Sequence, residues 1–103
     1  MLYIVFVLVD AQQNDAWFDW MRDAHIPDVM KTGCFSDATF VRDPTADDGS
    51  GLGYRILYRA PSAGAFERYQ AEFGDSLRSE HTELFGAHAR AHRELLPILA
   101  RFD

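Results

Sequence analysis

The sequence predicts one α+β domain, residues 1–103, whose elements follow the order β-α-β-β-α before a last segment of undecided type. Three observations predict this class: an apolar run at 2–9, two segments with apolar residues at helical spacing, and alternation of side-chain types at 54–59. A length of 103 residues fits a single domain with a hydrophobic core of its own.

The apolar run at 2–9 predicts a central strand that is covered on both faces, because a half-exposed strand would alternate with polar residues. Asn14 or Asp15 can then cap a helix by accepting a hydrogen bond from its first amides. Pro27 lacks an N–H, so this helix should kink or restart there. Gly33 is the expected end of the helix.

Residues 34–42 are rich in strand-forming side chains, and a polar connector at 43–51 separates them from a third strand at 54–59. The two tyrosines and the isoleucine of this third strand share one face. Ser62 can cap a second helix, which Gly74 interrupts before a further helical stretch begins.

The segment after the second helix, residues 87–102, supports two predictions. Its alanine, arginine, glutamate and leucine content favours a helix, which is the choice that propensity alone makes. Alternation favours a strand, with His88, Arg90, His92 and Glu94 on one face. Local rules leave this alternative open, because tertiary contacts often override propensity.

If the last segment is a strand, the order of elements is the split βαβ, ferredoxin-like arrangement. Right-handed connections then place both helices on one face of the sheet. The opposite face would be apolar and uncovered, which a soluble monomer avoids. We therefore expect a homodimer in which two sheets pack together.

Composition excludes several function classes. The formal charge is −6, with nine arginines and only Lys31 as lysine, so the chain lacks the basic surface of a general nucleic-acid binder. Cys34 is the single cysteine, so the sequence contains no intrachain disulfide and no multi-cysteine metal site. The apolar run at 2–9 is too short to span a bilayer and has no basic flank. We expect a soluble, cytoplasmic protein that does not bind membranes.

Two separated motifs resemble an uncharacterised family of the dimeric α+β barrel superfamily. The first, at 17–35, is W-x-x-W-M-x-x-x-H-I-P-x-V-M-x-T-G-C-F. The second combines E-R-Y-Q-A-E at 67–72 with L-R-x-E-H-T-E-x-F-G at 77–86. The resemblance implies a ferredoxin-like protomer, a β-barrel formed across a dimer, and a final strand near 87–96.

The wider superfamily that the chain resembles includes antibiotic-biosynthesis monooxygenases, muconolactone isomerases, EthD-like proteins and haem-degrading monooxygenases. The family itself carries no reaction that can be transferred. The function is therefore unknown, with a candidate pocket for a small molecule. One hypothesis is a cofactor-independent enzyme of monooxygenase or isomerase type, and the other is a non-catalytic ligand-binding or interaction module.

Four residues are candidates for such a pocket. His25 and His81 are the candidate catalytic acid and base, because imidazole gains and loses a proton near neutral pH. Tyr69 and Arg78 are the candidate substrate-binding residues. The structural alternatives are that His25 bonds a backbone carbonyl freed by Pro27, and that His81 belongs to a network that joins the interrupted helix.

Neither a metal nor a cofactor is expected. On a strand, His88 and His92 are about 13 Å apart and cannot share one ion. The acidic tract at 43–49 lacks the late glutamate of a calcium loop. Haem-degrading relatives use a pocket asparagine, which the first strand lacks, and both tryptophans, Trp17 and Trp20, are assigned to the core.

Three arginines of the predicted strands remain undecided: Arg55, Arg59 and Arg93. If they point into the barrel of the dimer, they form a cavity suited to anions. If they point outward, they are ordinary solvated side chains.

Overall fold

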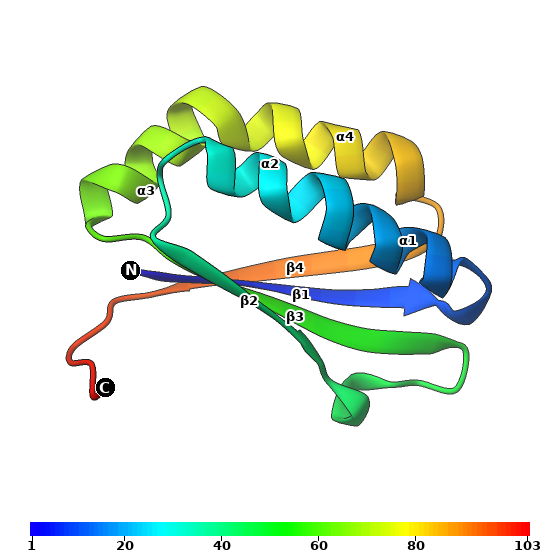
Figure 1. Ribbon diagram of the computed structural model, residues 1–103. Coiled ribbons are helices and arrows are strands. Elements are labelled where there is room, and N and C mark those ends of the chain that lie inside the picture. The colour runs from blue at the N-terminus through cyan, green and yellow to red at the C-terminus, as the bar shows by residue number, and fades with distance from the viewer.

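The computed structural model describes all 103 residues as a four-stranded antiparallel sheet with α1, α2, α3 and α4 on one face (Figure 1). The strand order is β2-β3-β1-β4, so the apolar first strand is central, as predicted. This is the ferredoxin-like βαββαβ fold. The strands are β1 (Leu2–Asp10), β2 (Asp37–Arg42), β3 (Gly51–Arg59) and β4 (Ala89–Leu96).

Just before Pro27, where the sequence predicts a kink or a restart, the first helical segment changes from a π-helical turn to an α-helix without leaving helical geometry. It consists of α1 (Asn14–Trp20), a π-helical turn (Met21–His25) and α2 (Ile26–Lys31). The prediction of a side-chain cap was wrong. A short 3-10 turn leads directly into α1 without any capping bond, and Asn14 instead accepts a hydrogen bond from the hydroxyl of Tyr54.

The second helical segment is capped as predicted, since the Ser62 hydroxyl accepts a hydrogen bond from the backbone N–H of Ala65 at 3.1 Å. It consists of α3 (Ala63–Tyr69), a π-helical turn (Gln70–Gly74) and α4 (Asp75–Phe85). The interruption expected at Gly74 is this π-helical turn, and the ribbon passes through it without a break (Figure 1).

The last segment is the strand β4, although local propensity favours a helix. All eight of its residues pair with β1. Without β4, the apolar strand β1 would be an edge strand with unpaired backbone groups. The register places Ala89, Ala91, Arg93 and Leu95 on the helix side and His92 on the opposite side. Strand pairing with β1 therefore overrides propensity here.

The core lies between the helices and one face of the sheet. On this face β1 contributes Tyr3 and Val7. The strand β3 contributes Tyr54, Ile56 and Tyr58, the set predicted to share one face. Trp17 is completely buried, which confirms its place in the core, and Trp20 packs against the same cluster. Aromatic rings from β1, β3 and both helical segments pack against one another in tilted and edge-on arrangements within this core.

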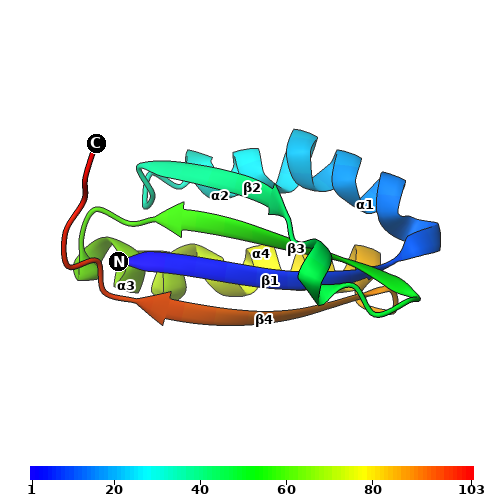
Figure 2. The same ribbon diagram turned by 90° about the horizontal axis from the view of Figure 1, so that it is seen from below.

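The other face of the sheet carries neither of the two long helical segments, and only the one-turn 3-10 helix Pro44–Ala46 of the β2–β3 connector lies against it (Figure 2). Alternation in β1 places Leu2, Ile4, Phe6 and Leu8 on this face. Arg55 and Arg59 of β3 lie on it too, and each is paired with an aspartate from the β2 side of the sheet. The outer face is thus an apolar stripe bordered by ion pairs.

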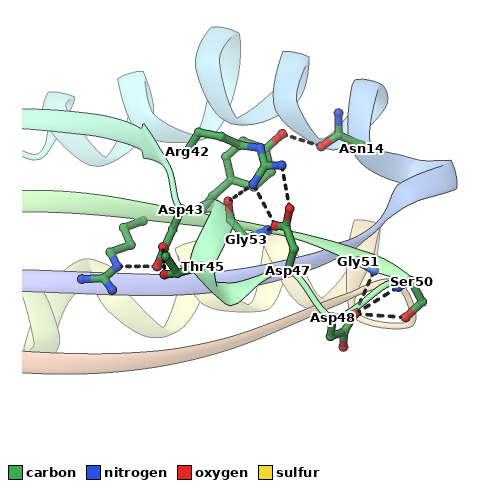
Figure 3. Close-up of polar contacts among 11 residues, drawn as sticks. Asn14, Arg42, Asp43, Thr45, Asp47, Asp48, Ser50, Gly51 and Gly53 are labelled. Carbon is green, nitrogen blue, oxygen red and sulfur yellow. Dashed lines mark hydrogen bonds and ion pairs between the residues drawn. The ribbon is translucent and has the colours of Figure 1, made fainter.

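The polar connector between β2 and β3 is held by side-chain hydrogen bonds (Figure 3). Arg42 donates two bonds to Asp47, at 2.9 and 3.0 Å, and Asp43 accepts one from Arg55 at 2.8 Å. Asp48 accepts hydrogen bonds from the backbone N–H groups of Ser50 and Gly51. These contacts bring the connector close to the start of β3.

This close approach predicts that Gly53→Ala is destabilising. An added Cβ would lie 2.5 Å from the carbonyl oxygen of Asp43 and 2.6 Å from Cβ of Ala46. Because both obstacles are short and fixed, we expect a loss of about 2 kcal/mol in the free energy of unfolding, measured by urea denaturation. In the control Gly64→Ala the added Cβ makes only an ordinary van der Waals contact, with Oγ of Ser62 at 3.9 Å, and it favours the helix, so this variant should be neutral or stabilising.

Candidate functional site

A small cavity lies between the helical segments and the sheet, with a volume of about 20 Å³. This is room for about one water molecule. The cavity brings together all four residues that the sequence predicts for a site: His25, His81, Tyr69 and Arg78. Their catalytic and binding roles remain predictions.

His25 is the last residue of the first π-helical turn, and its Nδ1 is buried without a hydrogen-bond partner. The structural alternative, in which His25 bonds a freed backbone carbonyl, therefore has no support at this nitrogen. The ring packs against Trp20, with centroids 4.9 Å apart. Burial, aided by the charge that His81 would carry, lowers the pKa of His25 to about 4, so the imidazole is neutral at neutral pH.

His81 of α4 is also buried, but it has a partner. The indole N–H of Trp17 donates a hydrogen bond to its Nε2 at 3.0 Å. Because Nε2 accepts, the neutral ring carries its proton on Nδ1. Burial and then the charge of Arg93 lower the pKa of His81. The centroids of the two imidazole rings lie 6.1 Å apart. His81 has a hydrogen-bond partner at Nε2, whereas Nδ1 of His25 has none.

Three phenols and two guanidinium groups complete the polar lining. Burial raises the pKa of Tyr69 to about 12 and that of Tyr58 well above its usual range, so both hydroxyls stay protonated. Tyr3 of β1 joins them in the cavity wall. Arg78 donates a hydrogen bond to Asp75 at 2.7 Å, and Arg93 of β4 lies on the same cavity.

Sequence reasoning missed Tyr3 and Tyr58, and it left Arg93 undecided. The register of the sheet would have placed all three at the cavity. In that register Tyr3 pairs with Tyr58 of β3, and Arg93 is one of the residues of β4 that face the helices. Arg93 thus separates from Arg55 and Arg59, which lie on the outer face.

A wider hollow at the surface adjoins the cavity and has a volume of about 320 Å³. The two spaces share Tyr3, Arg78 and Arg93, which form the neck between them. The hollow opens beside β4, where seven of the eight residues are exposed because β4 is an edge strand.

No carboxylate lines the inner cavity. The arrangement offers one buried imidazole nitrogen without a partner at His25, several hydroxyl donors, and fixed positive charge from two arginines. Such a site can hold negative charge on a ligand and accept a proton from it. No three His, Cys, Asp or Glu side chains lie close enough together to share a metal ion. None of the helices has the length and apolar character needed to cross a bilayer.

Solved structures of the same fold include several proteins with very different sequences. An antibiotic biosynthesis monooxygenase is 13% identical, with a TM-score of 0.66 over 97% of this chain and 100% of its own. SnoaB from Streptomyces nogalater, a cofactor-independent oxygenase solved as the mutant N63A, is 13% identical, with a TM-score of 0.64 over 97% and 94%. A dimeric ferredoxin-like protein from an uncultured marine organism is 13% identical, with a TM-score of 0.61 over 98% of both chains.

At these identities the structural neighbours show the fold alone, and they confirm the predicted ferredoxin-like fold. No curated protein matches the chain in sequence. A family model, described as a domain of unknown function (DUF4286), matches residues 1–99. This agrees with the resemblance that the two sequence motifs indicate, and the chain belongs to the DUF4286 family.

Proposed function

We propose that the protein binds a small organic molecule in the cavity and adjoining hollow, and that Nδ1 of His25 forms a hydrogen bond with it. The observation that carries this proposal is the buried Nδ1 of His25, which has no partner in the protein. A buried polar atom without a partner costs stability, so its retention favours a role in binding a ligand.

The size of the site limits how a ligand binds. The inner cavity holds about one water molecule, so only part of an organic molecule fits beside the histidines. The rest occupies the hollow of about 320 Å³. In this arrangement Tyr69 and Arg78 orient the ligand, as the sequence predicts, and His81 stays bound to Trp17.

A second candidate function is a cofactor-independent enzyme of monooxygenase or isomerase type. Its support is a neutral imidazole in a partly dry cavity, next to side chains that stabilise negative charge. Both reaction types begin when a base removes a proton from the substrate, and His25 would be that base. SnoaB, a cofactor-independent oxygenase, has the same fold.

The two tryptophans provide a direct test of binding. Trp20 packs on His25 and Trp17 bonds His81, so a ligand in the cavity should change the intrinsic fluorescence. We expect a saturable change with members of a panel of phenols and aromatic acids, and its loss in His25→Leu. A panel that gives no saturable change, or equal binding by His25→Leu, would contradict the proposal.

We further propose a homodimer formed through the outer face of the sheet. The apolar stripe of β1 lies there between ion pairs, and neither of the two long helical segments covers it (Figure 2). Val41 and Leu96 extend the apolar surface and are 37% and 47% exposed. Burial of such a face against a second copy is the common solution for sheets of this type.

Phe6→Asp is expected to convert the dimer to a monomer at micromolar concentration, because the carboxylate would be desolvated in the interface. Light scattering should give twice 11.7 kDa for the wild type and 11.7 kDa for the variant. Leu84→Asp is the matched control, since Leu84 is 54% exposed on α4, away from the outer face, and should stay dimeric. A monomeric wild-type protein would overturn this proposal.

A further inference from the structure

Arg93 differs from every other arginine in the chain. Eight of the nine arginines lie 3.4 Å or less from a carboxylate oxygen, and Lys31 pairs with Asp28 at 3.8 Å. Arg93 has no such partner, in a chain with more acidic than basic residues. Its guanidinium lines the inner cavity and the hollow.

The neck of the site places a second cation near Arg93. Arg78 lines the same two spaces, and its one carboxylate partner, Asp75, has a side chain that is 95% exposed. An ion pair with so exposed a partner is weak, so Arg78 remains able to bind a ligand. The glycine at position 74 leaves room for the guanidinium of Arg78, because a Cβ at that position would lie 2.9 Å from one of its nitrogens.

We propose that the ligand is a small organic carboxylate whose anionic group lies at the neck between Arg78 and Arg93. This inference rests on the proposed function and names the ligand class of the same site. The apolar body of the molecule lies in the hollow, where Phe66 and Leu95 form part of the wall. The hydroxyl of Tyr3 lies at the neck and provides a further donor.

A carboxylate fits this neck better than other anions or a neutral group. Its planar pair of oxygens matches the paired donors of a guanidinium. One oxygen can enter an inner cavity that holds about one water molecule, whereas a phosphate group is larger. Glu94 lies at the rim of the hollow, and together with the net charge of −6 it disfavours a polyanion. A neutral ligand would leave Arg93 without a counter-charge.

Benzoate and benzamide test this inference, since they have nearly the same shape and differ in charge. Binding is followed by tryptophan fluorescence and by chemical-shift changes in NMR titrations. We expect wild-type protein to bind benzoate at least tenfold more tightly than benzamide. Arg93→Gln should weaken benzoate binding at least tenfold and change benzamide binding less than twofold. Arg93 is exposed on an edge strand, so this variant should fold normally.

Arg90→Gln is the matched control. Arg90 lies on the same strand but faces the outer side of the sheet and pairs with Asp48, and the variant removes the same charge. It should bind benzoate within twofold of wild type. Equal weakening by Arg90→Gln and Arg93→Gln would overturn the neck as the binding site.

The outcomes also separate this inference from the proposed function. If benzoate and benzamide bind equally well, the small-molecule site stands and the carboxylate inference fails. If benzamide binds and benzoate does not, the inference fails in the same way. If neither compound binds at millimolar concentration, nor any member of the wider panel of phenols and acids, the proposed function fails as well.

Discussion

Replacing His81 with leucine is expected to lower the free energy of unfolding by about 2 kcal/mol. The indole N–H of Trp17 donates to His81 at 3.0 Å, and Trp17 is completely buried. Leucine keeps much of the volume but leaves this N–H without an acceptor in the core. Urea denaturation with a constant m-value should report the loss.

His25→Leu is expected to change the free energy of unfolding in the opposite direction. The buried Nδ1 of His25 has no partner, so an apolar side chain removes a desolvation cost and should raise the free energy of unfolding by about 1 kcal/mol. The same substitution should abolish ligand binding. Gain of stability with loss of function is the usual signature of a functional residue held in an unfavourable environment.

The comparison of the two histidine variants decides between structural and functional roles. Equal destabilisation by both substitutions would show that His25 has an unrecognised partner in the folded protein. In that case the main argument for a ligand at Nδ1 would be lost. A neutral His81→Leu would instead show that the hydrogen bond with Trp17 contributes little to stability.

Sequence alone could not separate these histidines. Both lie on helices at positions that local rules treat alike, and the motifs place both in the same family pattern. Their difference depends on Trp17, which is 64 residues before His81 in the chain and donates its N–H to one ring only. Such a contact depends on how the two helical segments pack, which no local spacing encodes.

The fold itself was more predictable, because periodicity determines most of its elements. The central position of β1 follows from its unbroken apolar run, and the buried face of β3 follows from alternation. The strand β4 does not follow from local propensity, because its stability comes from pairing with β1. The resemblance to a known family supplied that element.

The polar lining of the site follows from the register, which sequence analysis did not assign. Tyr3 was placed in an unbroken apolar strand where no face could be distinguished, and Arg93 in a segment of undecided type. Once β4 pairs with β1, both side chains must point toward the helices. The residues at the neck, which would bind the carboxylate, are therefore the least predictable part of the site.

Acidification from pH 6.5 to pH 4 is expected to destabilise the protein by about 3 kcal/mol through His25 alone. The unfolded chain binds a proton at this imidazole near pH 6.5, whereas burial delays protonation in the folded protein to about pH 4. Stability is therefore complete above pH 6.5 and is lost as the pH falls through this range. His81 adds to the loss in the same direction, because burial lowers its pKa too.

The pH range distinguishes the histidines from the acidic connector. Hydrogen bonds lower the pKa of Asp43, Asp47 and Asp48 below 3.8, so their contributions are lost only at lower pH. Urea denaturation at several pH values should show a steep loss between pH 6.5 and 4 in the wild type. His25→Leu should flatten this curve. A wild-type curve that is flat above pH 4 would mean that solvent reaches His25 freely, because burial is the largest cause of the difference between its folded and unfolded pKa values.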